Sequence, residues 1–171
     1  YRIKVSEKKG SPSGTSVDFE RVVTEEALEP IGQYTTEWTV RDMAVREKTA
    51  FLASKKGLEA VDFTNSLLPS RISRKSFGKK GRSVAIMGDW VLLGRGPGGL
   101  KVINAAEPEQ MEAVGRAFTF GMPRDVAVMD RTAYTAQGLF GMDVFDLSDP
   151  TAPEHIDTLS FHAVVFGAEA H

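Results

Sequence analysis

The chain has 171 residues, a net charge of −2 and a hydrophobic content of 42%, values that are ordinary for a globular protein. The small net charge gives no global field that attracts nucleic acid, and no apolar run reaches the roughly 18 residues of a membrane helix. The absence of cysteine excludes disulfides, thiolate metal sites and cysteine nucleophiles. Because the chain begins at Tyr1 and not at Met, we expect a mature, trimmed or partial chain.

Residues 1–39 predict three strands separated by turn-forming segments. The strands are expected at Arg2–Val5, Gly14–Phe19 and Pro30–Tyr34, with an enlarged connection at Glu20–Glu29. They resemble the second, third and fourth strands of the units that follow along the chain. We therefore interpret this region as a repeat unit that lacks its first strand.

A repeat of about 42 residues organises the rest of the chain. The segment Gly57–Phe63 recurs as Gly99–Ala105 and again as Gly141–Leu147. Apolar segments upstream keep the same spacing in the three units, at Met43–Val45, Val84–Ile86 and Val126–Val128. Spacing that holds across separate blocks indicates repeated structural units and not a chance match.

Each unit is expected to form four short strands. In the third unit these strands are predicted at Arg124–Met129, Thr132–Ala136, Gly141–Leu147 and His155–Phe161. The apolar runs of the middle strands are typical of strands covered on both faces, as in stacked blades. Four strands at this period predict an all-β fold: a β-propeller of about four blades, or a portion of a larger propeller. A β-sandwich is the competing interpretation, but sandwiches do not repeat internally at this period.

The chain is interpreted as a single propeller domain or a four-blade segment. The expected divisions are an incomplete blade at 1–39, blades at 40–79, 80–121 and 122–161, and a last strand at 162–171. The segment Ala163–Phe166 in this last part either closes the ring against Arg2–Val5 or begins the next blade. The sequence leaves both alternatives open.

The third unit resembles a known repeat family. Residues 124–153, with an apolar third strand followed by Ser148-Asp149-Pro150, resemble an LVIVD repeat. The first unit keeps Val61-Asp62-Phe63 but departs from the pattern just after it, and the second unit departs further. The resemblance implies a propeller and an extracytoplasmic setting, which is periplasmic, secreted or at the cell surface. It carries no catalytic residues, because the repeat motif is a strand and a turn.

Two local patterns have a functional and a structural interpretation. The segment Gly94–Gly99 matches the phosphate-binding pattern G-x-G-x-x-G, but a strand and not a helix follows, so a glycine-rich turn is favoured. Asp62, Asp146 and Asp149 recur near strand ends and offer too few oxygens for calcium. Carboxylates that hold turns through backbone amides are the favoured interpretation.

Positive charges are concentrated between residues 71 and 82. The candidate anion-binding patch consists of Arg71, Arg74, Lys75, Lys79, Lys80 and Arg82. An acidic polymer or an acidic protein surface would match these charges, whereas nucleic acid is not expected because Phe77 is the only aromatic residue among them. A solvated connection between blades, where charge prevents edge pairing, is the favoured alternative.

Leu139 and Phe140 stand at a predicted hairpin tip whose sister tips are polar or small. Two apolar side chains at such a position predict a contact with another chain, by a protein partner or by self-association. The structural alternative is that this tip folds onto the neighbouring blade.

The residues favour a non-catalytic propeller that acts as a protein-binding or structural module, with no cofactor and no metal. The alternative is a propeller hydrolase or lactonase with a site at the central channel. Only residues at the starts of the innermost strands could supply that site, namely Arg41, Asp42, Arg82, Arg124 and Asp125. The three histidines, His155, His162 and His171, are expected at the surface or at strand ends.

Overall fold

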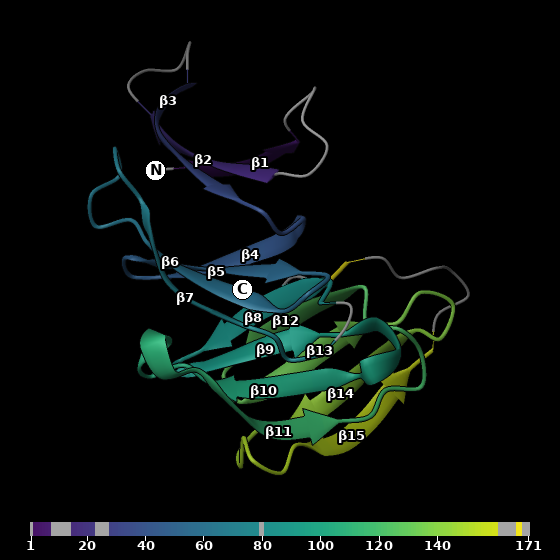
Figure 1. Ribbon diagram of the computed structural model, residues 1–171. Helices are drawn as coiled ribbons and strands as arrows, with labels where there is room; N and C mark the ends of the chain where they lie inside the picture. Colours follow the sequence, from purple (N-terminus) through teal and green to yellow (C-terminus); the bar gives the residue numbers. More distant parts are fainter. Residues whose placement is uncertain (1, 8–14, 23–27, 79–80, 161–166, 169–171) are drawn as a thin grey trace.

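The computed structural model describes residues 2–7, 15–22, 28–78, 81–160 and 167–168, and it is built from antiparallel sheets (Figure 1). The N-terminal sheet has the strand order β1-β2-β3, with β1 at Arg2–Glu7, β2 at Thr15–Val22 and β3 at Leu28–Thr36. The connection expected at Glu20–Glu29 is shorter than predicted, because β2 extends to Val22 and β3 begins at Leu28.

Three four-stranded sheets follow, and in each of them successive strands are hydrogen-bonded neighbours. The first contains β4 (Val40–Arg46), β5 (Thr49–Ser54), β6 (Leu58–Asp62) and β7 (Ser70–Lys75). The second contains β8 (Ser83–Met87), β9 (Trp90–Gly94), β10 (Leu100–Asn104) and β11 (Glu112–Ala117). The third contains β12 (Asp125–Met129), β13 (Thr132–Ala136), β14 (Met142–Asp146) and β15 (Glu154–Leu159). Two short 3-10 turns, η1 (Gly96–Gly98) and η2 (Pro108–Gln110), flank β10.

The sheets pack in chain order, as blades of a propeller do. Figure 1 shows the N-terminal sheet beyond β4–β7, with the other two sheets following on the opposite side. The first strand of each blade lies innermost, since β4 contacts β8 and β8 contacts β12. This sequential stacking confirms the predicted four-stranded units. It differs from the sandwich alternative, in which two sheets face each other.

A carboxylate on an innermost strand accepts a bond from a distant backbone amide at two equivalent places. One oxygen of Asp42 accepts a hydrogen bond of 2.7 Å from the Val84 amide, at the start of β8. In the third blade, Asp125 accepts a bond of 2.9 Å from the Ala168 amide. Ala168 therefore stands to β12 as Val84 stands to β4. The segment Ala163–Phe166, predicted to close the ring or start a blade, lies outside the described residues.

The core lies between blades and not inside a single sheet. Phe51 of β5 and Ile103 of β10 belong to one fully buried cluster shared by the first two four-stranded blades. Leu92 and Phe145 belong to a second cluster, shared by the next pair. Burial of each large side chain contributes roughly 1.5–3 kcal/mol, so the middle strands hold the blades together. Within the described part of the chain, no helix has the length and apolar character needed to cross a membrane.

Candidate functional site

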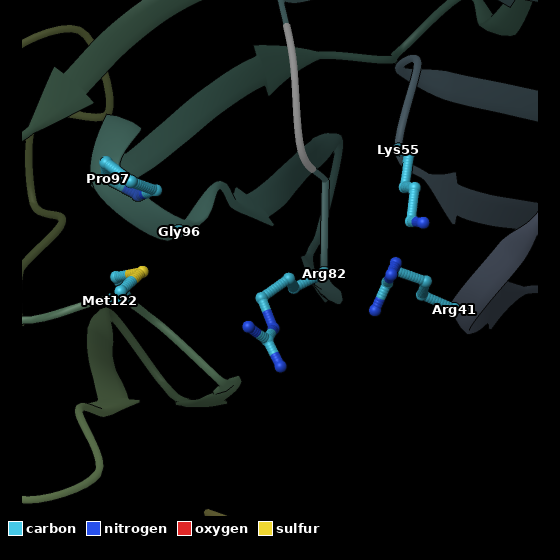
Figure 2. Close-up of a pocket in the computed structure, with 6 residues that line it drawn as sticks. All are labelled: Arg41, Lys55, Arg82, Gly96, Pro97 and Met122. Carbon is cyan, nitrogen blue, oxygen red and sulfur yellow. The ribbon is translucent and has the colours of Figure 1, made fainter.

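One end of the blades combines an open pocket with exposed side chains, and we call this end the tip face. It carries the hairpins between the second and third strands of each blade and the connections leading into β8 and β12. A cavity of about 350 Å³ on this face, which we call the cationic pocket, is lined by Arg41, Lys55, Arg82, Gly96, Pro97 and Met122. Figure 2 shows the charged ends of the three basic side chains directed into the same open space.

The repeat brings two arginines to this pocket. Arg41 is the second residue of β4 and Arg82 directly precedes β8, while Arg124, which directly precedes β12, lines a neighbouring groove. The backbone fixes two of these positions in the same way, because Arg82 and Arg124 each donate their amide to the carbonyl that ends the second strand of the blade. Among the described residues, no carboxylate forms an ion pair with Arg41, Lys55 or Arg82. The cationic pocket is thus suited to an acidic group.

An apolar groove of about 530 Å³ continues from the cationic pocket, with Pro97 and Met122 shared between the two. The connection from β11 to β12 forms one wall through Phe120, which is 74% exposed. The tip between β13 and β14 forms the other wall through Leu139, which is 78% exposed, and Phe140. Exposed apolar side chains gathered at one place are typical of a surface that contacts another molecule.

The sequence singled out only part of this apolar groove. Leu139 and Phe140 were predicted to contact another chain. In the structure both side chains are exposed. Phe118, Phe120 and Met122 were not singled out from the sequence. Their signal was present, since three large apolar residues alternate with small ones across Phe118–Met122 in a stretch with no expected strand.

The predicted anion-binding patch is divided among different environments. Arg74 pairs with the buried Glu59 at 3.2 Å and with Glu37 at 3.3 Å, and Arg71 approaches Glu59 at 3.9 Å. Lys75 instead donates a 2.6 Å bond to the carbonyl of Met111 on the next blade. Of the other members, Arg82 lines the cationic pocket, and Lys79 and Lys80 lie outside the described residues.

Glu59 is the centre of a buried polar network between the N-terminal sheet and the first four-stranded blade. It is 1% exposed and accepts hydrogen bonds from the hydroxyls of Tyr34 and Thr36 as well as from Arg74. Burial, together with the Glu59 carboxylate, raises the pKa of the Tyr34 hydroxyl far above its ordinary value. Arg74 is held inside this network, whereas Arg71 is half exposed at its edge.

The aspartates at strand ends hold turns, as the favoured interpretation predicted. Asp62 accepts a bond of 2.7 Å from the Thr64 amide, and Asp146 accepts one of the same length from Ser148. Hydrogen bonds from the hydroxyls of Thr64 and Ser148, together with these amide bonds, lower the pKa of the two carboxyl groups. No group of three or more acidic or histidine residues is positioned to hold a metal ion among the residues that the structure describes.

The groups considered for catalysis have structural partners. Asp42 accepts amide bonds from Met43 and Val84, while burial raises the pKa of its carboxyl group. Asp125 accepts amide bonds from Val126 and Ala168. Both carboxylates therefore accept backbone hydrogen bonds, and Asp42 joins β4 to β8.

The histidines do not form a cluster in the described structure. His155 on β15 lies 3.0 Å from the Thr158 hydroxyl and 3.6 Å from a carboxylate oxygen of Asp143, with its ring edge against Phe120 and Phe145. This places His155 at a strand start, as predicted. His162 and His171 lie outside the described residues.

The segment Gly94–Gly99 forms a hairpin tip, as the favoured interpretation of the G-x-G-x-x-G match predicted. The short turn η1 is followed by β10, with no α-helix whose N-terminus could face a phosphate. Positive backbone φ angles of 54° at Gly96 and 70° at Gly99 explain why glycine occupies these positions.

Comparisons with known proteins agree with this fold. Residues 120–158 match the family model of the LVIVD repeat, which confirms the resemblance seen in the third unit. No curated protein matches the chain. The class defined by fold and sequence is therefore an all-β protein of propeller-type blades that contains an LVIVD repeat.

Two solved structures show a similar arrangement of strands. Their titles are "COPII on membranes, outer coat vertex" and "The structure of the COPII coat assembled on membranes". Each aligns with a TM-score of 0.70 and 12% sequence identity over 91% of this chain. This chain covers 45% of the first matched chain and 25% of the second, so it spans less than half of either. At this identity the similarity establishes the fold alone.

Proposed function

We propose that this chain is a non-catalytic β-propeller module that binds a protein partner through its tip face. The observation that carries the proposal is the continuity of the exposed apolar groove with the cationic pocket across Pro97 and Met122. The similar chains belong to a coat assembled on membranes, which supports a role in protein assembly. By resemblance to the LVIVD family alone, we also propose an extracytoplasmic location, which is periplasmic, secreted or at the cell surface.

The blade count is part of the same proposal. Three complete blades and the three-stranded N-terminal sheet give about four units, as a ring or as a portion of a larger ring. The bond between Asp125 and Ala168 supports a further innermost strand beside β12, since it repeats the bond by which Asp42 holds β8.

The partner is a protein segment that carries bulky apolar side chains next to acidic ones. Phe120, Leu139 and Phe140 provide a groove that accepts a leucine or an aromatic ring. The neighbouring arginines, Arg41 and Arg82, match a carboxylate in charge and in hydrogen-bonding geometry. A purely apolar segment would leave these cations unmatched, and a purely acidic one would leave the groove exposed.

A displayed library of random peptides tests this proposal. Peptides selected on the full chain are expected to contain aspartate or glutamate beside leucine or an aromatic residue. The double variant Leu139→Ser, Phe140→Ser is expected to lower their affinity by at least about tenfold, as truncation of hot-spot residues does. The double variant Arg41→Gln, Arg82→Gln is expected to lower affinity and to flatten its dependence on salt.

The matched control uses two other exposed leucines. Leu67 and Leu68 lie in the connection between β6 and β7, away from the tip face, and are exposed to a similar degree. Changing both to serine removes as much exposed apolar surface without touching the groove, so peptide affinity should not change. Peptides without acidic residues, or peptides that bind both tip-face variants like the parent, would contradict the proposal.

A further inference from the structure

One cross-strand pair occupies the same place in all three four-stranded blades, and its chemistry differs in the middle blade. In the first blade Glu59 stands opposite Arg74, and the two form an ion pair at 3.2 Å. In the third blade Asp143 stands opposite Thr158, which donates a bond of 2.8 Å to it. Each acid is buried and paired with a donor.

The middle blade has two cations at this place. Lys101 of β10 stands opposite Arg116 of β11, in the same register as the sister pairs. Side chains of directly opposed residues project from the same face of a sheet, and like charges there are destabilising. No carboxylate forms an ion pair with either residue among the residues that the structure describes.

A third cation joins this pair from the hairpin tip. Leu93 is the registered partner of Lys101 on β9, and Arg95 follows one residue after the end of that strand, close enough for its charge to act on Lys101. The Arg95 guanidinium lies against Gly78, and its Nε atom is buried with no hydrogen-bond partner among the described residues. A buried nitrogen of this kind is expensive to leave unpaired, and it is a donor that an anion could use.

The electrostatics of the cluster agree with this geometry. Burial lowers the pKa of Lys101, and the charges of Arg95 and Arg116 lower it further. Burial and Arg116 also lower the pKa of Arg95. Arg116 is held over the ring of Phe118 at 4.1 Å, which orients its guanidinium without neutralising it. The cluster therefore has the charge and the donors to hold an anion.

We propose that Arg95, Lys101 and Arg116 form a binding site for a phosphate group. The anion takes the electrostatic role that the carboxylates of Glu59 and Asp143 have in the sister blades. Two guanidinium groups and one ammonium group match the charge and the several oxygens of phosphate better than those of a single carboxylate. This site does not use the glycine amides of the G-x-G-x-x-G match, and it goes beyond the proposed protein-binding function.

The melting temperature of the full chain tests the site. It is measured as sodium phosphate replaces sodium chloride at constant ionic strength, and calorimetric titration gives the affinity. At a phosphate concentration of about ten times the dissociation constant, the parent is expected to melt about 3–6 °C higher. O-phosphoserine is titrated in parallel to separate a phosphate ester from free phosphate, and acetate is titrated to represent a carboxylate.

The decisive variant is Lys101→Glu, which places a carboxylate in the middle blade at the position of Glu59 and Asp143 in the other two. It is expected to melt higher than the parent in chloride and to bind phosphate at least about tenfold more weakly. Lys48→Glu makes the same change in net charge in the exposed turn between β4 and β5, and it should bind phosphate like the parent. An equal rise in melting temperature for the parent and Lys101→Glu would overturn the proposal, because phosphate then acts only as an excluded salt. Acetate binding as tight as phosphate binding would overturn it as well.

Discussion

The first and second four-stranded blades carry opposite charges at the same cross-strand position, which is Glu59 in the first and Lys101 in the second. Glu59 in the first blade is buried, yet Arg74 and two hydroxyls of the neighbouring sheet satisfy its oxygens. Lys101 in the second blade faces Arg116 and has no such partner among the described residues. The repeat fixes the backbone at this place, while the side chains are free to diverge. A satisfied pair contributes to folding, whereas an unsatisfied cluster is available to a ligand.

The largest expected effect comes from giving the first blade the charges of the second. Glu59→Lys removes the acceptor of Tyr34, Thr36 and Arg74 and places a like charge beside the arginine. Breaking a buried pair in this way costs about 3–5 kcal/mol of unfolding free energy, which urea denaturation measures. Glu109→Lys, at an exposed position, is the control and should change stability by less than about 0.5 kcal/mol. A small effect of Glu59→Lys would show that the buried network is not stabilising.

The variant Gly78→Ala tests whether Arg95 takes part in the proposed phosphate site of the second blade. Both Gly78 and Gly88 have positive φ angles, of 92° and 55°, so alanine at either position should cost about 1 kcal/mol. Only at residue 78 does the added β-carbon meet the Arg95 guanidinium, whereas nothing lies within 4 Å at residue 88. We therefore expect similar urea midpoints for the two variants but weaker phosphate binding for Gly78→Ala alone. Equal phosphate affinities of the Gly78→Ala and Gly88→Ala variants would show that Arg95 is not part of the site.

A smaller effect is expected from the pH dependence of stability. The pKa of Lys101 is lower in the folded chain than its ordinary value of 10.5, so the unfolded chain binds more protons between these two values. The unfolding free energy contributed by this group therefore rises as the pH rises through that interval. Lys101→Met should lack this rise and should be more stable than the parent at neutral pH by about 0.2–1 kcal/mol. If the unfolding free energies of parent and variant change in parallel with pH in chloride, the lowered pKa expected for Lys101 is wrong.

The smallest effect on stability is expected at the tip face. Leu139 and Phe140 are exposed, so changing both to serine should alter the unfolding free energy by less than about 0.5 kcal/mol. The same change at Leu67 and Leu68 should have a similarly small effect. Thermal denaturation of both double variants checks this, and a large loss only at the tip would show that Leu139 and Phe140 pack against a neighbouring blade.

Much of the fold could be predicted because its signals are local or periodic. The strand expected at Thr132–Ala136 is β13 without change, and the other strands of that blade shift by one or two residues at their ends. The turn role of Asp62 was predictable because its partner, Thr64, is two residues away. The comparison of equivalent tips singled out Leu139, but its exposure was one of two alternatives that the sequence left open.

The candidate sites were less predictable because their members come together only through register and blade stacking. Phe120 and Leu139 line the same apolar groove although they belong to different connections along the chain. Arg71 and Arg74 were grouped with Arg82 by their proximity in sequence. In the structure β7 turns the first two toward Glu59, while Arg82 opens onto the cationic pocket.

The repeat, the four-stranded units and the turns could be predicted from the sequence, because they depend on residue spacing and on hydrogen bonds between near neighbours. Which charges lie close together depends instead on strand pairing and blade packing. Asp42 and Val84 are 42 residues apart in the chain, and Lys101 faces Arg116 only through the pairing of β10 with β11. Electrostatic energy depends on distance and burial in space, so the same repeat position is a closed network at Glu59 and an open cluster at Lys101.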